Sequence, residues 1–497
     1  MQIQASCVRS SNALVCLAVG LLVPIVAFSQ NAVLYEGARL IIGDASGPIE
    51  NGAFVVQNGR ITAIGPKGSV KAPSGAARVD LTGKTVMPTM NNVHIHAGYE
   101  GYLSWSAENH SAENLLDHME REAFYGVGAA ETMGDQPDAF AIKFQQDQIA
   151  GKFPLAARFF FAAGVAPPGG GPDLLLITGT TPLHAVHEVS TPDEAIAAVR
   201  LLASEKIAQL KIWVDKRDNS RGAHKEMPLE VVEAVVSEAH KHGIIVHAHV
   251  TQMPEQKEVV KAGVDVVVHT VANEKIDDEY IALLKEKKPY WAPVMGLGDV
   301  NELCEENNTF VDQVIPDSVI ADTRAGRTPI GKYYAALSTP CSSAGPNPRA
   351  EENRKYNFSK MIESGARLVL STDAGVSPKY SYGSAEHHEI TMYARYGLSP
   401  ADIIIAATSR PTEVLKIKDA GTLAKGKRAD FIVLNANPLE NIRNTREINS
   451  VYLYGAKLDR AELQAKFKKA VVDRDAYKAK TTKDYVPHPP SARNGSN

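Results

Sequence analysis

Two histidines separated by one residue, His94 and His96, stand in the short segment NVHIHA. On a β-strand, residues two positions apart point to the same side. Both imidazoles can therefore reach one metal ion. A His-x-His pair also arises by chance, so the pair alone is a weak sign of a metal site and gains weight only if further ligand-type side chains join it.

Three more ligand-type side chains stand near the ends of apolar runs. His247 lies in GIIVHAHV, His269 in VDVVVHT and Asp373 in ARLVLSTDA. Left unpaired in apolar surroundings, each would cost about 1–3 kcal/mol. A bound metal ion offsets this cost, so we predict that these side chains converge with the histidine pair on a metal site.

A lysine interrupts a fifth apolar run, AQLKIWV, where Gln209, Lys211 and Trp213 share one face of the expected strand. If helices cover the outside of the sheet, this face is buried. A buried lysine needs a lowered pKa or a partner. Carboxylation by CO2 is one chemical answer, because the resulting carbamate has two oxygens that can bridge two cations.

These side chains need a scaffold that gathers the ends of several strands. Eight strand-like runs alternate with helical stretches such as PLEVVEAVVSEAHKHG. Eight βα units predict an α/β fold, a (β/α)8 TIM barrel, in which catalytic groups stand at the carboxyl ends of the strands. An open, doubly wound sheet is the alternative that the count of eight disfavours. The runs are residues 86–97, 126–134, 157–164, 208–214, 243–250, 264–270, 290–295 and 366–374.

Both ends of the chain are rich in alternating, strand-like segments with turns such as Asn58-Gly59. We predict that residues 30–87 and 420–460 form one small β-sandwich domain, and that the barrel occupies 88–419. Residues 297–360 interrupt the βα rhythm and are predicted to be an insertion that covers the active-site face. Residues 461–497 are predicted to be a C-terminal tail that begins as a basic helix.

The first 29 residues contain a single charged residue, Arg9, then an apolar run, and end in Ala27-Phe28-Ser29. This layout predicts a cleaved signal peptide, and hence a periplasmic or secreted protein with no stable membrane span after cleavage. A membrane anchor is the alternative, but the run is shorter than the roughly 20 residues that a span needs. Cleavage would leave Cys304 and Cys341, which form either one disulfide or two free thiols.

The 497 residues carry a net charge of −4 and 22% charged residues. A charge so near neutral, without a basic stripe, gives no reason to expect nucleic acid as a partner. A small-molecule enzyme and a neutral binding protein both fit this composition.

Several motifs together resemble the amidohydrolase superfamily, and specifically its imidazolonepropionase-like and prolidase-related branch. They are the turn GVGAAETMGD, the strand QLKIWV, VHAHV followed by AGVDVVVHT, the string STDAG, and GTLAKGKRADFIVLNANPLENI near the C-terminus. The last string is the most specific. The resemblance extends from about Val33 to Asp459.

The resemblance implies a site for two divalent metal ions, zinc by preference. It implies that His94, His96 and Asp373 bind the more buried ion, that His247 and His269 bind the more exposed one, and that N6-carboxylated Lys211 bridges both. Asp373 would also shuttle a proton, and His249 would contact the substrate or transition state. The chain departs from the family at Pro88-Thr89-Met90-Asn91-Asn92, where a glycine and an aspartate are replaced. Support of the ligands by that aspartate is thus in doubt.

The substrate is less clearly indicated. Arg217, in a loop after the fourth strand, could hold a substrate carboxylate, although a solvated charged loop is the plain alternative. Tyr380 and Tyr382 follow the Asp373 strand and are predicted to line the pocket, with His388 nearby on the next helix.

The expected activity is hydrolysis of an amide bond in a dipeptide, an N-acyl amino acid or a related small molecule by a hydroxide that bridges two metals. The alternatives are a single-metal cyclic-amide hydrolase or deaminase, a lactone or ester hydrolase on the same barrel, and a non-catalytic binding protein. Lys211 disfavours the single-metal alternative, and the filled ligand positions disfavour the binding protein. The sequence leaves open whether the protein forms a homo-oligomer.

Overall fold

The computed structural model describes residues 32–102, 107–172, 185–214, 218–219, 222–223, 226–299, 308–324, 347–376 and 381–470. The predicted signal segment, both cysteines that would remain after cleavage, Arg217 and Tyr380 lie outside these residues. Among the helices described, none has the length and apolar character needed to cross a membrane.

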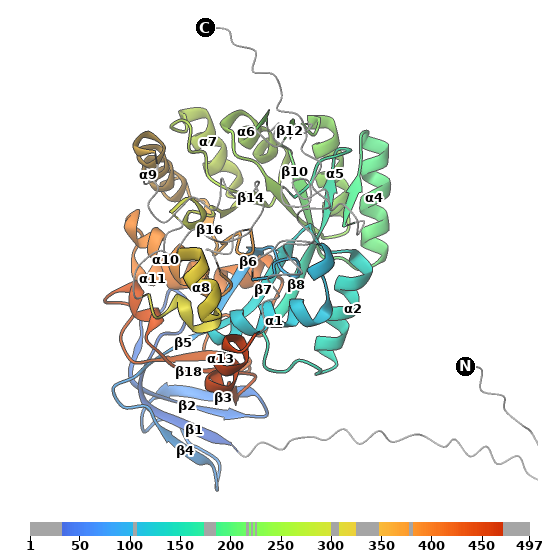
Figure 1. Ribbon diagram of the computed structural model, residues 1–497. Helices are drawn as coiled ribbons and strands as arrows, with labels where there is room; N and C mark the ends of the chain where they lie inside the picture. The colour runs from blue at the N-terminus through green and yellow to red at the C-terminus, as the bar shows by residue number, and fades with distance from the viewer. Residues whose placement is uncertain are drawn as a thin grey trace, which may run out of the picture.

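Strands from the two ends of the chain share one sheet, which lies at one end of the molecule (Figure 1). β17 pairs antiparallel with β5, and β5 pairs in parallel with β1. The Asn58-Gly59 turn, with both residues at positive φ, folds β2 back on β3 as predicted. Strands from both ends of the chain thus form one sheet, and a separate β-sandwich domain of residues 30–87 and 420–460 stays a prediction. Its strands are β1 (Val33–Leu40), β2 (Ile49–Gln57), β3 (Arg60–Pro66), β4 (Ala77–Asp80), β5 (Thr85–Pro88), β17 (Phe431–Leu434), β18 (Ile448–Leu453) and β19 (Ala456–Lys457).

Four aromatic rings hold this unit together. Tyr35 stacks on Phe54 at 4.9 Å, and Phe431 stacks on Tyr452 at 4.4 Å. Phe54 meets Phe431 edge to face at 5.1 Å, which joins the N-terminal pair to the C-terminal pair. The packing of these rings explains why both ends of the chain are needed for one core.

The second sheet contains eight parallel strands in chain order, one in each of the eight predicted runs. They are β6 (Met90–Ile95), β7 (Val127–Met133), β8 (Arg158–Ala166), β10 (Gln209–Trp213), β13 (Ile245–His249), β14 (Val266–Val268), β15 (Tyr290–Ala292) and β16 (Arg367–Leu368). Short strands β9 (Val186–Glu188), β11 (Asp218–Asn219) and β12 (Gly222–Ala223) are additions to this plan. The predicted eight-strand α/β architecture is thus confirmed.

Backbone hydrogen bonds join the two edges of this sheet. The segment after β16 runs beside β6: the amide of Val93 donates to Leu370, and the amide of Asp373 donates to the carbonyl of His94 at 2.9 Å. Ile95 and Ala374 complete a parallel bridge. The sheet therefore curls until its first and last strands meet, as in a (β/α)8 barrel.

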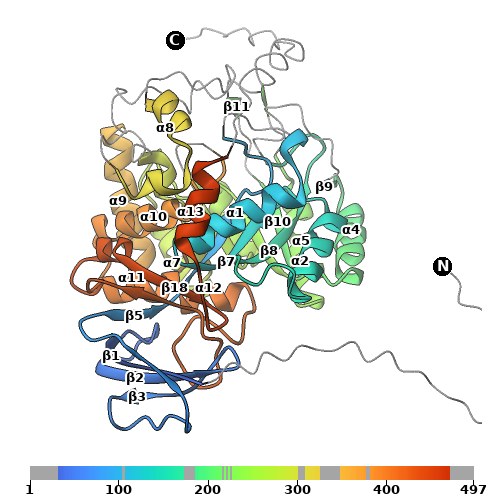
Figure 2. The same cartoon turned by 60° about the horizontal axis from the view of Figure 1, so that its bottom comes forward.

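Helices cover the outer face of these strands, with α1, α2, α4 and α5 alongside β7, β8 and β10 (Figures 1 and 2). α5 buries Val231, Val232, Val235 and Val236 at helical spacing, and α4 begins with a capping box at Thr191. The helices are α1 (Ala112–Phe124), α2 (Asp138–Ile149), α4 (Pro192–Ser204), α5 (Leu229–Lys241), α6 (Met253–Ala262), α7 (Asp278–Lys287), α8 (Asp317–Arg324), α9 (Pro348–Glu363), α10 (Ser384–Arg395), α11 (Pro400–Ala407), α12 (Ser409–Val414) and α13 (Arg460–Lys468).

The described part of the predicted insertion contains α8 and most of α9, and α9 packs against α7. The predicted tail begins with α13, whose Phe467 is fully buried near Phe124 of α1. The start of the tail is therefore anchored on the barrel, because Phe467 buries an apolar ring there. The covering role of the insertion stays a prediction.

A test of barrel closure follows from Gly375, which has a φ of +95° directly after the bridge. A Cβ at this position would overlap the carbonyl oxygen of His96 and press on the hydroxyl of Tyr382. We expect Gly375→Ala to lower the free energy of unfolding by about 2–4 kcal/mol, measured by denaturant titration.

The matched control is Gly397→Ala, because Gly397 has a similar φ of +99° but nothing within 4 Å of an added Cβ. This control isolates backbone strain and should cost about 1 kcal/mol. Equal losses in both variants would contradict a tight seam between the first and last strands.

Candidate metal centre

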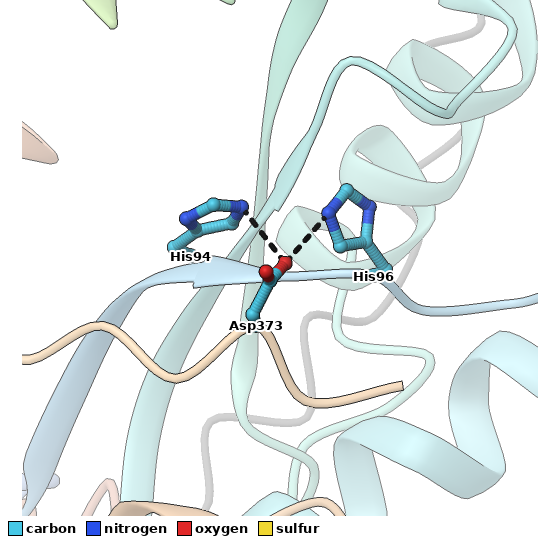
Figure 3. Close-up of side chains that lie close together, drawn as sticks. All are labelled: His94, His96 and Asp373. Atoms are coloured by element: carbon cyan, nitrogen blue, oxygen red, sulfur yellow. Dashed lines mark ion pairs between the residues drawn. The ribbon is translucent and has the colours of Figure 1, made fainter. Parts of the chain in front are cut away.

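Three ligand-type side chains from opposite ends of the barrel sequence meet in the protein interior (Figure 3). Oδ1 of Asp373 lies 3.2 Å from Nε2 of His94 and 2.9 Å from Nε2 of His96. All three residues are buried, and one ligand atom from each lies within 4.8 Å of the others. Two imidazoles and a carboxylate are a donor set that suits zinc or a similar divalent ion.

Asp373 reaches this position through an unusual backbone conformation. Its φ is +63°, in the left-handed region, and its amide donates to the carbonyl of His94. Burial by itself would raise the pKa of Asp373, but His94 and His96 hold this pKa well below its ordinary value. Asp373 is therefore an ionised carboxylate at neutral pH.

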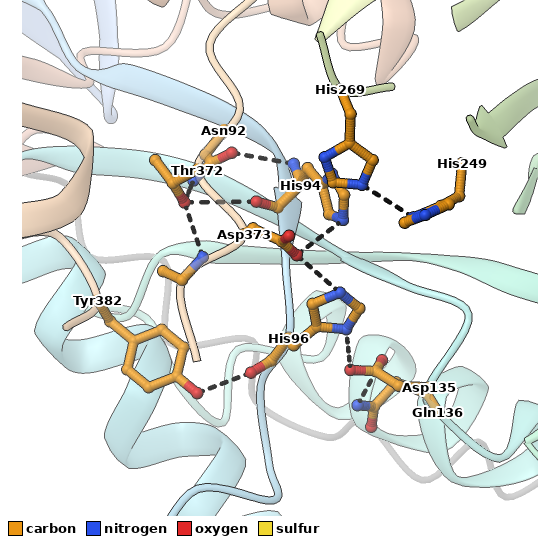
Figure 4. A network of polar contacts seen from close by, with 11 residues as sticks. Asn92, His94, His96, Asp135, Gln136, His249, His269, Thr372, Asp373 and Tyr382 are labelled. Carbon is orange, nitrogen blue, oxygen red and sulfur yellow. Dashed lines mark hydrogen bonds and ion pairs between the residues drawn. The ribbon is translucent and has the colours of Figure 1, made fainter. Parts of the chain in front are cut away.

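His96 is oriented by a second carboxylate. Its Nδ1 lies 2.9 Å from Oδ2 of Asp135, whose other oxygen accepts a hydrogen bond from Gln136 at 3.1 Å (Figure 4). Burial alone would lower the pKa of His96, but the hydrogen bonds to Asp135 and Asp373 raise it to about 9. Asp135 thus turns Nε2 of His96 toward Asp373, a role that carboxylates commonly play behind metal-binding histidines.

Sequence reasoning did not assign Asp135 a role, although this residue closes the quoted motif GVGAAETMGD. A signal was present, since Asp135 follows directly after β7, where polar residues reach the mouth of a barrel. What the sequence lacked was the partner, because His96 lies on another strand.

His94 is held by Asn92, the residue that replaces the family's aspartate. Oδ1 of Asn92 accepts the amide of His94 at 2.9 Å, and its Nδ2 donates to Thr372 at 2.7 Å and to Glu386. Glu386 is buried beside Glu122, and burial raises the pKa of both. An aspartate at 92 would add a further carboxylate to this group, whereas the asparagine donates to it and still supports His94.

Lys211 lies in the barrel interior with 1% of its surface exposed, as its strand face predicted. Burial and then the Lys211 ammonium lower the pKa of His94 to about 3, and the same two causes hold the pKa of His247 well below its ordinary value. The Lys211 ammonium therefore acts on a histidine of the first strand and on one of the fifth.

His247 is the register partner of Lys211 on the neighbouring strand. Its Nε2 lies 2.9 Å from Oε1 of Gln209, whose amide nitrogen donates to the carbonyl of Val414. That arrangement makes Oε1 of Gln209 the acceptor and Nε2 of His247 the donor. Nδ1 of His247 is buried without a hydrogen-bond partner among the described residues, so it is the nitrogen left for a ligand.

His249 and His269 meet at the same side of the barrel (Figure 4). Nε2 of His269 lies 2.8 Å from Nδ1 of His249, and the ring centroids of His269 and His94 are 5.7 Å apart. His269 has a φ of +75°, which redirects its side chain at the end of β14. The structure thus brings His269 close to the cluster of His94, His96 and Asp373 and sets His249 beside it.

The predicted substrate contacts are placed as follows. Tyr382 is fully buried, donates its hydroxyl to the carbonyl of His96 at 2.7 Å and stacks on His118. This contact is with protein, so a role for Tyr382 at the substrate stays a prediction. His388 is 8% exposed on α10.

The amidohydrolase family model matches residues 85–458. An imidazolonepropionase of Deinococcus radiodurans is 34% identical over 104 residues, which are 20% of this chain and 25% of that protein. An ochratoxinase of Aspergillus niger is 24% identical over 457 residues, 84% of each chain.

Among solved structures, a Xaa-Pro dipeptidase with methionine bound in its active site superposes with a TM-score of 0.65 at 23% identity. The match covers 86% of this chain and 100% of that chain. At this identity the likeness shows the fold. Together with the family match over most of the chain, it supports the motifs found in the sequence: the chain belongs to the amidohydrolase family and is a metal-dependent hydrolase by membership.

Proposed function

We propose that this protein is an exported hydrolase with two metal ions that cleaves an amide bond in a dipeptide, an N-acyl amino acid or a related small molecule. One observation carries the proposal: Lys211 is buried in the barrel interior, is the register partner of His247 and lowers the pKa of both His247 and His94. A buried lysine in that position suits a carbamate that bridges two cations.

The residues divide into two metal positions. His94, His96 and Asp373 would hold the first ion, His247 and His269 the second, and carboxylated Lys211 would belong to both. Nitrogen and carboxylate donors suit zinc. When bound, such ions lower the pKa of water toward neutral and polarise a substrate carbonyl.

The protein's own groups would move the proton. Asp373 is ionised, and so accepts the proton of the attacking water and returns it to the leaving amine. His249, beside His269, would face the substrate carbonyl and hold its developing negative charge. The similarity to ochratoxinase and to a Xaa-Pro dipeptidase supports an amide or dipeptide substrate.

Cleavage of the signal peptide after about residue 29 would release the protein into the periplasm or medium. N-terminal sequencing of protein from the native host tests this part separately. A screen of dipeptides, N-acyl amino acids and lactones with the metal-loaded protein tests the substrate class.

The two-ion proposal predicts about two zinc ions per chain by elemental analysis, and nearly complete loss of hydrolysis in Lys211→Ala, because that variant lacks the bridging group. His387→Gln is the control, since His387 is a buried histidine bound to Thr445 and to the carbonyl of Tyr125. One ion per chain together with an active Lys211→Ala would instead support a single-metal deaminase or cyclic-amide hydrolase.

A second prediction concerns protons. Because the pKa of His96 is about 9 in the metal-free protein, an ion that binds there must displace a proton at neutral pH. The affinity for the first ion should rise about tenfold per pH unit from roughly neutral pH and level off near pH 9. Calorimetry in buffers of different ionisation enthalpy measures the released proton.

In Asp135→Asn the affinity should level off at a lower pH, since the variant removes the carboxylate charge that raises the pKa of His96. A flat affinity between neutral pH and pH 9 in the wild type would show that His96 is already deprotonated or is not a ligand.

A further inference from the structure

A buried glutamate, Glu131, lies beside the proposed second metal position without an assigned role. It is on β7 and is fully buried. Its Oε2 is 3.7 Å from Nε2 of His247, although β8 and β10 separate β7 from β13 in the sheet. The glutamate side chain therefore reaches across the barrel interior.

Neither carboxylate oxygen of Glu131 has a hydrogen-bond partner among the described residues. A buried carboxylate without a donor is unfavourable, and such groups are found next to cations or metal sites. Burial raises the pKa of Glu131 well above its ordinary value, and the ammonium of Lys211 offsets part of that rise. Lys211 and His247, both proposed metal ligands, are thus the groups that Glu131 faces.

His247 shows what Glu131 can do there. The Nε2 side of its ring faces Gln209 at 2.9 Å and Glu131 at 3.7 Å, while Nδ1 is left for a ligand. His96 also uses one ring nitrogen for a supporting group and the other for the metal site, but the nitrogens are exchanged. Its Nδ1 faces Asp135 and its Nε2 faces Asp373. Each proposed metal position therefore has one carboxylate behind one of its histidines.

Both supporting carboxylates come from one short segment, ETMGD, at the end of β7. Glu131 lies within the strand and Asp135 just after it.

We propose that Glu131 is a positioning residue for the second metal position: its carboxyl group lies beside Nε2 of His247, which Gln209 binds, and acts on Lys211, so that Nδ1 of His247 stays directed to the metal. The proposal rests on the two-ion function proposed above. Glu131 does not touch the substrate in this scheme and acts only through the two ligands.

The test measures zinc binding to the full-length mature protein against a competing chelator. Glu131→Gln keeps the shape and removes the charge, and we expect one of the two ions to bind about 10–100-fold more weakly while the other is unchanged. Asp135→Asn is the matched variant, because it removes one charge behind His96 and should lower the affinity for the other ion.

A His247→Ala background identifies the ion. In that background one ion remains, and Glu131→Gln should have no further effect, whereas Asp135→Asn should still weaken binding. Glu389→Gln controls for the loss of a buried carboxylate elsewhere, since Glu389 accepts the amides of Met295 and Gly296. If Glu131→Gln does not fold, Glu131→Asp serves instead. This variant keeps the carboxylate but shortens the side chain, and it should lower the affinity for the same ion.

Two ions of unchanged affinity in Glu131→Gln, or an equal loss in the His247→Ala background, would overturn the role of Glu131 and leave the two-ion function standing. A single ion in the wild type would overturn the two-ion function itself, and the role of Glu131 with it. The two failures are therefore distinguishable.

Discussion

The closure of the parallel sheet is the constraint on which the site depends. His94 and His96 stand on the first strand and Asp373 follows the last, so no local structure can bring them together. The backbone bonds between β6 and the segment after β16 do so, and the same bonds involve the ligands: the carbonyl of His94 accepts the amide of Asp373. The metal-binding cluster is thus part of the seam of the barrel, and Gly375 lets the chain pass His96 closely enough to complete it.

The interior of this barrel contains many ionisable groups that face polar or charged groups from other strands. Lys211 lowers the pKa of both His94 and His247, Asp135 lies behind His96, and Glu131 reaches toward His247 across two intervening strands. Unpaired, such groups would each destabilise the fold by several kcal/mol. Their concentration in one place fits a site that holds cations.

Asn92 illustrates how a departure from a family pattern is understood only with its neighbours. On the sequence alone, the loss of an aspartate before the His-x-His pair put the support of the ligands in doubt. In the structure, Asn92 still accepts the amide of His94, and its amide nitrogen donates to Glu386 of α10. A carboxylate is thus present beside this position, supplied by another element, and an amide is the side chain that suits such a neighbour.

The sequence by itself determined the ligand types, the eight strands and the family, because each of these is a local property. Alternation along a strand decides which residues share a face, and the carboxyl ends of parallel strands share one mouth, so His94, His96, Lys211, His247, His269 and Asp373 could be singled out without a structure. The same alternation predicted that Lys211 would be buried, and it is.

Only the tertiary structure decided which ring nitrogen of each histidine is held by the protein and which side chain holds it. Asp135, Gln209 and Glu131 are ordinary residues in the sequence, and their roles arise from contacts between strands far apart in the chain. Tyr382 is another case: its position after the Asp373 strand suggested the pocket, but its hydroxyl is bonded to the backbone of His96. These pairings depend on how far the sheet curls before it closes, which no local pattern of residues encodes.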